Sequence, residues 1–219
     1  MSSPLIQLLV LAGIALFLIL RLRDVLGTRE GFEKPQVTRQ DPNRAKRSDF
    51  EVIEGGPDSD ITDHVAEGSD AAKALVAMKA QEPSFSVSEF LGGARGAYEM
   101  ILMGFEAGDL AEIKPFLSDE VYESFAMVVE SRREQGLTIE ANFVGVRELK
   151  LVDAAFDPAT NEGEVTVRFV GELTSVVRDK GGEIIEGNPN EVKRQKDVWT
   201  FARTMGSNNP NWQLVATGG

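Results

Sequence analysis

Six large aromatic side chains are the residues of this chain best suited to bind an apolar ligand. They are Tyr98, Phe105, Phe169, Trp199, Phe201 and Trp212. Aromatic rings bury large apolar areas, and tyrosine and tryptophan also carry one polar atom each. Because the six recur at helix or strand spacing, they can line a cavity for an acyl chain or an apolar peptide, or they can fill a hydrophobic core. We treat all six as candidate pocket or partner-binding residues.

Side chains suited to catalysis are scarce. The chain has no cysteine, which excludes thiol nucleophiles, disulfides and thiolate metal sites, and its one histidine is His64. Motifs of phosphate-binding loops, zinc peptidases and serine hydrolases are absent from the sequence. Gly92, Gly93 and Gly96 lie inside a helical pattern, so we expect them to serve close helix packing rather than phosphate binding. The sequence therefore predicts a protein that is not an enzyme and has no cofactor or metal site.

The charge of the chain restricts its partners. The formal net charge is −12 at pH 7, and residues 84–219 hold 13 Lys and Arg against 22 Asp and Glu. Nucleic acid and anionic lipid repel such a region unless it has a local basic patch. Its one dense basic cluster is Lys193, Arg194 and Lys196, which can contact phosphates or acidic partners, or can protect a strand edge by charge. We expect no nucleic-acid partner.

The first 23 residues have the composition of a transmembrane helix. Residues 2–20 are uncharged and mostly apolar, and about 20 such residues are needed to cross the hydrocarbon core. A cleaved signal peptide carries its basic residues before the apolar run, whereas Arg21 and Arg23 follow it here. We therefore expect residues 1–23 to be a retained single-pass anchor. The basic flank behind the span predicts that the C-terminal part is cytoplasmic.

Residues 24–84 have the composition of a linker. They lose sustained apolar periodicity and are rich in Gly, Pro, Asp, Ser and Arg, with basic residues first and acidic residues later. Such a segment buries too little apolar surface to offset its ordering entropy, so we expect a flexible tether. Residues 71–80 are an exception, because their helix formers place an apolar stripe that can fold transiently or bind a partner.

Residues 85–219 predict one α+β domain. A capping box at residues 86–89 starts a first long helix, and a further helix ends near Gly136. From Leu137 the apolar pattern alternates as in strands, with a bulge or bend expected at Gly171. The predicted strands lie near residues 137–151, 165–177, 198–203 and 212–216. We expect a curved antiparallel sheet of about four strands, with the N-terminal helices packed on it.

Several segments of this region resemble one known family. They are residues 89–101, 105–110, 114–125, 197–203 and 209–216. Together they resemble the Tim44-like domain family over roughly residues 85–217 of this chain. With its apolar N-terminus, the sequence is most similar to the bacterial members of TimA type, which are described as membrane adaptor proteins.

The resemblance implies a fold, a location and a function. The fold is a cone related to the nuclear-transport-factor-two-like group, with an apolar pocket between helices and sheet. The location is the bacterial inner membrane, with protein partners and contacts to anionic lipid such as cardiolipin. The expected function is a membrane-anchored, protein-binding adaptor or scaffold, linked to protein translocation or to assembly of membrane protein complexes. Binding of a lipid or small hydrophobic ligand in the pocket is the alternative, and an enzyme of the same fold group ranks last. The mitochondrial member recruits a heat-shock chaperone through a basic N-terminal region, whereas this chain has an apolar segment followed by a tether of mixed and then acidic charge, so the resemblance leaves chaperone recruitment open.

Overall fold

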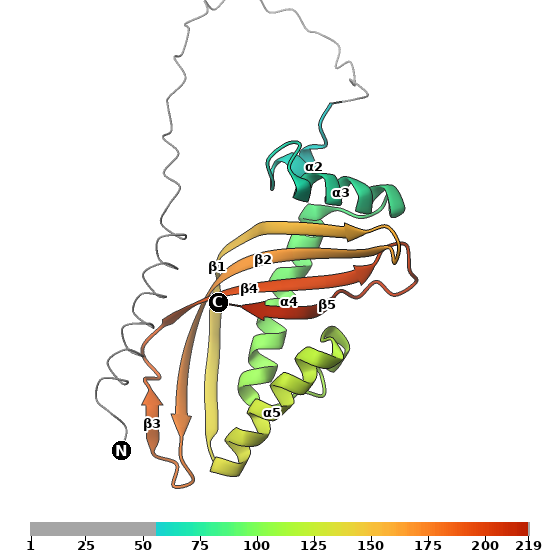
Figure 1. Cartoon of the computed structure of the whole chain (residues 1–219). Coiled ribbons are helices and arrows are strands. Elements are labelled where there is room, and N and C mark those ends of the chain that lie inside the picture. The colour runs from blue at the N-terminus through green and yellow to red at the C-terminus, as the bar shows by residue number, and fades with distance from the viewer. Residues whose placement is uncertain (1–55, 219) are drawn as a thin grey trace, which may run out of the picture. The chain divides into compact units, whose positions relative to one another are not determined.

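Helices come first in the chain, and a curved antiparallel sheet follows. The computed structural model describes residues 56–218 (Figure 1). Its helices are α2 (Ser59–Thr62), α3 (Asp70–Gln81), α4 (Val87–Ala107), the 3-10 turn η1 (Lys114–Phe116) and α5 (Asp119–Gln135). Its strands are β1 (Thr138–Asp157), β2 (Glu162–Arg178), β3 (Ile184–Gly187), β4 (Lys193–Thr204) and β5 (Gln213–Gly218). The predicted α+β class, with helices packed on an antiparallel sheet, is confirmed.

The sheet has five strands rather than about four. Its main order is β1-β2-β4-β5, and β3 pairs only with the end of β2. A turn at residues 179–183 joins β2 to β3, and the sequence pattern predicts no strand at β3. All four residues of β3 are exposed, so this strand has no alternation of buried and exposed side chains from which to predict it.

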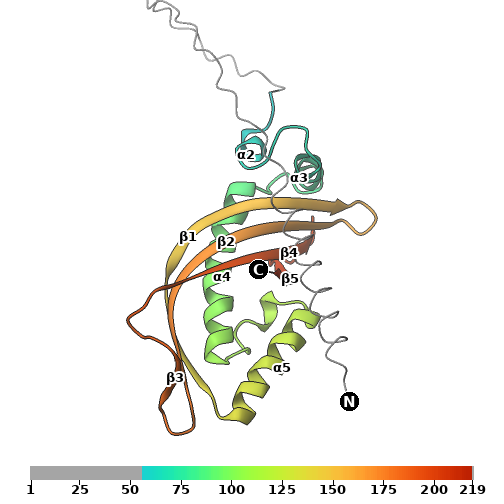
Figure 2. The ribbon, with the colours of Figure 1, turned by 60° about the vertical axis from the view of Figure 1, so that its left-hand side comes forward.

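Irregularities in β1 curve the sheet. The pairing of β1 with β2 shifts between Phe143 and Gly145, between Val146 and Glu148, and between Leu151 and Asp153. Each extra residue bends and twists the strand locally, and Figure 2 shows β1 and β2 curving around α4. The bend was expected at Gly171 in β2, but the shifts lie in the opposite strand.

The main core lies between α4 and the concave side of the sheet. As predicted, α4 starts at a Ser86 cap, whose Oγ accepts from the Glu89 backbone N–H at 3.3 Å, and it ends at Gly108 in the left-handed conformation. Helix α4 contributes Tyr98 and Ile101 to the core, both with no exposed area. The sheet contributes fully buried side chains from β2, β4 and β5, among them Val165, Val167, Phe169, Phe201 and Leu214.

Helices α2 and α3 belong to the same core, so the prediction of a flexible tether is wrong for residues 59–81. Leu75 and Met78 have no exposed area, and α3 packs against β1. The composition of the whole segment concealed this packing, because the buried residues of α3 form a single stripe, while Val76 on another side of the helix is exposed. The predicted stripe on residues 71–80 is correct, but it packs inside the domain.

Asp60 fixes α2 to the start of α4. Its carboxylate accepts hydrogen bonds from the backbone N–H groups of Val87 (2.8 Å) and Ser88 (2.9 Å), and it lies 2.8 Å from Lys79 Nζ. Burial alone would raise the pKa of Asp60, but the bonds from Lys79, Ser88 and Val87 outweigh it and hold the pKa far below its usual value. The N-terminal helices are therefore fastened to α4 by charge as well as by apolar packing.

The predicted transmembrane anchor and most of the predicted tether lie outside the described residues. Within residues 56–218, no helix combines the length and the apolar character needed to cross a membrane.

Candidate binding site

The six predicted aromatic residues fall into three groups. Tyr98 and Phe169 are completely buried, and their rings stack in parallel with centroids 4.4 Å apart. They therefore fill the core. Phe201 and Trp212 line an open pocket next to α4, and Phe105 and Trp199 line a smaller cavity at the other end of the same helix.

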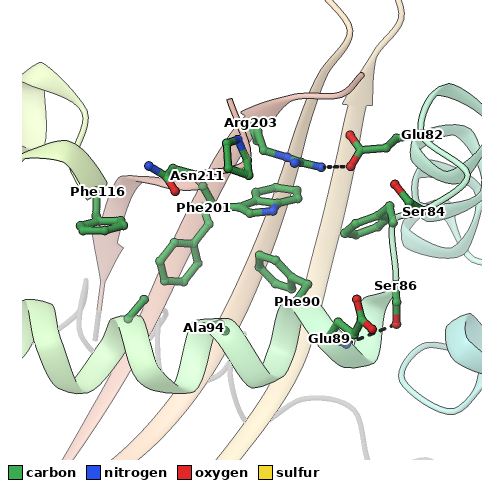
Figure 3. A pocket seen from close by; sticks show the side chains of 15 residues that line it. Glu82, Ser84, Ser86, Glu89, Phe90, Ala94, Phe116, Phe201, Arg203 and Asn211 are labelled. Carbon is green, nitrogen blue, oxygen red and sulfur yellow. Dashed lines mark hydrogen bonds and ion pairs between the residues drawn. The ribbon is translucent and has the colours of Figure 1, made fainter. Parts of the chain in front are cut away.

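The open pocket has a volume of about 330 Å³ and walls made of five aromatic rings (Figure 3). Phe90 comes from α4, Phe201 from β4, and Phe116 from η1, while Phe85 precedes α4 and Trp212 precedes β5. We call these five residues and the space between them the aromatic pocket. Sequence periodicity identified only Phe201 and Trp212 as pocket candidates. Phe85 lies in a loop after Pro83, and Phe116 lies in the short 3-10 turn η1 after Pro115, so neither belongs to a periodic apolar pattern.

The rings of the aromatic pocket hold one another in place. The Trp212 and Phe90 centroids are 4.7 Å apart at 61°, and the Phe90 and Phe201 centroids are 6.0 Å apart at 78°. Such edge-to-face contacts stabilise by about 0.5–1.5 kcal/mol beyond burial alone. Trp212 remains half-buried, so one side of this preformed aromatic surface faces the opening.

An ion pair closes one end of the pocket. Arg203 Nη2 donates to Glu82 Oε1 at 2.7 Å, and the other Glu82 oxygen accepts from the Gly206 backbone N–H at 2.9 Å. The Arg203 guanidinium also lies 5.2 Å from the centre of the Trp212 ring, a cation–π distance. Burial tends to raise the pKa of Glu82, but the Gly206 and Arg203 hydrogen bonds outweigh it and lower the pKa. The pair is thus a fixed polar wall of an otherwise aromatic space.

The rim of the pocket is more acidic than basic. Glu82 and Glu89 both line it, and Arg203 is the one basic residue among its lining side chains. Arg203 Nε is buried and has no hydrogen-bond partner within residues 56–218. An unsatisfied buried donor costs about 1–3 kcal/mol. The carboxylates of Glu82 and Glu89 repel an anion, so the pocket favours an apolar group accompanied by a neutral polar group.

The glycines of α4 contribute to the opening of the pocket. A Cβ at Gly92, Gly93 or Gly96 would meet no other atom within 4 Å, so the expected role in close helix packing is wrong. Gly93 lines the aromatic pocket, whereas Gly92 lines a groove with Arg95 and Leu149. The absence of a side chain at Gly93 leaves space in front of the aromatic rings.

The predicted basic cluster lies on the exposed surface of β4, away from the aromatic pocket. Arg194 Nε donates to Glu172 on β2 at 2.9 Å, and Arg147 of β1 lies 3.3 Å from the same carboxylate. Lys193 and Lys196 make no ion pair with another described residue. Contact of this cluster with an anionic partner stays a prediction.

Comparison with known proteins agrees with the resemblance in sequence. The family model of the Tim44-like domain matches residues 71–219. The chain belongs to the Tim44-like domain family. The matched region starts at α3, so the family domain begins earlier than the predicted residue 85, in agreement with the packing of α3 in the core.

The similarity to individual relatives covers only part of their length. The human mitochondrial import inner membrane translocase subunit TIM44 is 26% identical over 138 residues, which are 61% of this chain and 30% of that protein. The Arabidopsis thaliana subunit TIM44-1 is 21% identical over 143 residues, 65% of this chain and 30% of that protein. The match therefore spans less than a third of the length of these relatives. Among solved structures, the intermembrane space region of the chloroplast protein ARC6 has a TM-score of 0.35 at 11% identity, covering 53% of this chain and 82% of that one.

Proposed function

We propose that this protein is a membrane-anchored adaptor or scaffold that binds a protein partner at the bacterial inner membrane. Family membership supports this proposal, because the relatives are named as subunits of a mitochondrial inner membrane import translocase. By this proposal the protein acts in protein translocation or in assembly of membrane protein complexes. Residues 1–23 form its single anchor, and the cone-like domain is cytoplasmic and acts without catalysis.

The aromatic pocket is the observation that carries the proposal. Trp, Tyr and Arg are enriched among the few residues that dominate protein interfaces, and they do so where they are rigid and surrounded by a polar rim. Here Trp212 and Phe90 form a fixed aromatic surface beside the Arg203–Glu82 pair. An apolar side chain of a partner would insert against these rings.

Site-specific photo-crosslinking in intact membranes tests this proposal. A photoreactive amino acid at exposed Asn211, on the rim of the pocket, should give a discrete protein adduct. The same probe at Glu183, in the β2–β3 turn at the far end of the sheet, should not give this adduct.

Two neighbouring glycines provide a matched pair of variants for the same experiment. Gly93→Leu fills open space inside the aromatic pocket, whereas Gly92→Leu places the same side chain outside it. The Asn211 adduct should disappear with Gly93→Leu and persist with Gly92→Leu. No adduct at Asn211, or the same adduct from Glu183, would contradict the proposal.

A second candidate function is binding of a lipid or small hydrophobic ligand in the same pocket. Ligand pockets usually have volumes of about 300–1,000 Å³, and this one lies at the lower limit at about 330 Å³. The acidic rim of the pocket favours a neutral headgroup. We propose that any contact with anionic lipid is made instead by Lys193, Arg194 and Lys196. Native mass spectrometry of the full chain should then show a retained ligand that Gly93→Leu removes and Gly92→Leu does not. Its absence from the unsubstituted protein would exclude this alternative.

A further inference from the structure

A second cavity lies between α4, α5 and the sheet, apart from the aromatic pocket. Its volume is about 160 Å³, and its apolar walls include Phe105 of α4, Phe125 of α5 and Trp199 of β4. The Phe105 and Phe125 ring centroids are 4.4 Å apart, and both rings are half-buried. The cavity has about half the volume of the aromatic pocket. It accommodates a small group, not a long acyl chain.

Two carboxylates face this aromatic space. Asp197 lies on β4, where its oxygens accept from Tyr98 Oη at 2.6 Å and from Gln195 Nε2 at 3.1 Å. Glu106 lies on α4 and lines the same cavity. Within residues 56–218, neither carboxylate forms an ion pair. The cavity therefore has a negative charge that the neighbouring described side chains do not neutralise by direct contact.

The surroundings of Glu106 make its negative charge costly. Burial raises the pKa of Glu106, and the nearby positive charge of Arg132 opposes the shift only in part. Burial and the charge of Asp197 raise the pKa of Tyr98, so the tyrosine stays a hydrogen-bond donor to Asp197. A carboxylate in a partly desolvated, aromatic setting is stabilised when a cation joins it.

The aromatic walls also favour a cation. The Arg132 guanidinium already lies 4.4 Å from the centre of the Phe105 ring and donates to the Phe105 carbonyl oxygen at 3.2 Å. Ring faces attract ammonium and guanidinium groups, and this attraction grows when water is excluded. Arg132 binds from outside the cavity, since it is not among the lining residues, and a second cation would have to come from a ligand.

We propose that the cavity between Phe105, Phe125 and Trp199 binds a primary alkylammonium group, which donates hydrogen bonds to Asp197 and Glu106. Each carboxylate oxygen has more than one acceptor position, and an ammonium supplies three donors. The alkyl stem packs on the aromatic rings while the charge faces the two carboxylates. The ammonium belongs either to a lysine side chain of a partner or to a free small amine, because both present the same chemistry.

The two tryptophans of the chain provide a test with an internal control. Trp199 lines the ammonium cavity and Trp212 lines the aromatic pocket, so an ¹⁵N-labelled full chain gives one indole signal for each site. Trp212→Phe assigns the two signals. Titration with butylammonium chloride should shift the Trp199 signal with a Kd of about 1 mM, in the range of weak single-group binding, and should leave Trp212 unchanged.

Substitutions and a neutral probe separate charge from apolar contact. Asp197→Asn and Glu106→Gln should each weaken butylammonium binding about tenfold, because each removes one of the two charges with little change of shape. Glu67→Gln, at an exposed position between α2 and α3, removes the same charge elsewhere and should change nothing. Butan-1-ol should not shift Trp199 at the same concentration. An equal response to butan-1-ol, or no response of Trp199 to butylammonium, would overturn the proposal.

A final arm distinguishes the two sources of the ammonium. Nα-acetyl-lysine methylamide should displace butylammonium at a similar concentration if the natural ligand is a partner's lysine. If only the free amine binds, the site selects a small metabolite amine. This inference does not depend on the proposed scaffold function, because it rests on a different cavity and a different tryptophan.

Discussion

Two aromatic cavities share helix α4, and they differ in how their charged groups are paired. In the aromatic pocket, Glu82 is bound by Arg203 and by the Gly206 backbone, and the other carboxylate, Glu89, is exposed to solvent. In the smaller cavity, Asp197 accepts only neutral donors, and no described side chain forms an ion pair with it. Similar rings thus line spaces of different chemistry. Aromatic residues alone therefore do not determine which ligand a cavity binds. The nearby charges, and whether they are paired, decide whether the ligand is apolar or cationic.

The layer between the two cavities is structural, and substitution of Phe169 should have the largest effect. Phe169 is fully buried, and its ring centroid lies 5.8 Å from that of Trp199 and 6.5 Å from that of Phe201. Trp199 and Phe201 line different cavities. Phe169→Ala should lower the free energy of unfolding by about 3–5 kcal/mol, as for other buried aromatic residues. Trp212→Ala should cost less, since Trp212 is half-buried. Urea denaturation measures both, and an equal loss would contradict the distinction between core and pocket.

Gly171 should be the next most sensitive position. A Cβ there would lie 2.6 Å from Tyr98 Oη and 2.9 Å from Tyr98 Cε1, so the tyrosine would have to move away from Asp197. Gly171→Ala should cost about 1–3 kcal/mol, as overpacking of cores does. Gly145→Ala is the matched control, since a Cβ at Gly145 meets nothing within 4 Å. Thermal unfolding compares the stability of the two variants. If Gly171→Ala is as stable as Gly145→Ala, Tyr98 can move without cost and the prediction is contradicted.

Breaking the ion pair of the aromatic pocket should have an effect of similar size. The side chains of Arg203 and Glu82 are 9% and 20% exposed, so Glu82→Gln leaves a largely buried guanidinium without its charge partner. We expect a loss of about 1–3 kcal/mol of stability. Glu148→Gln removes the partner of Arg168, but both of these side chains are more than 40% exposed, and exposed pairs contribute about 0–1 kcal/mol. Chemical denaturation measures the loss of stability in both variants. Equal losses would mean that the Arg203–Glu82 pair contributes no more than an exposed ion pair.

Asp60 holds the start of α4, which lies beside the aromatic pocket. The contribution of Asp60 to the stability of the fold should depend on pH. Asp60→Asn keeps one acceptor oxygen but replaces the other by a donor, so it loses one of the two backbone bonds and the ion pair with Lys79, which should cost about 0.5–1.5 kcal/mol at neutral pH. Its folded-state pKa is lowered, so its contribution is complete above the ordinary value of 3.8 and is lost as pH falls below it. Unfolding measured from neutral pH down to about pH 2 should show the two proteins converging at the acid end. A constant difference across that range would contradict this role.

The sequence predicts most of the regular structure, because α4 and β4 have strong and simple patterns. The cap at Ser86 and the alternation of Trp199 and Phe201 both appear in the structure. The packing of helix α3 in the core and the existence of strand β3 could not be predicted in the same way. The burial of Leu75 and Met78 depends on β1, far away in sequence, and β3 has no buried face.

The candidate site was predictable only in part, for a similar reason. Phe201 lies in a periodic strand, whereas Phe85 and Phe116 lie in a loop and a short 3-10 turn that tertiary structure brings together. The pairing of Arg203 with Glu82 joins residues 121 positions apart, so no local pattern could have indicated it. The roles of Tyr98 and Phe169 also required the three-dimensional arrangement, because core and pocket residues have the same periodicity.

The most direct test of this account is the separate response of the two indole signals in the full chain. Octan-1-ol, an apolar and uncharged probe, should shift the Trp212 signal and leave Trp199 unchanged, whereas butylammonium should shift Trp199 and leave Trp212 unchanged. If each probe shifts both signals to the same extent, the two cavities do not differ in chemistry, and the account is contradicted.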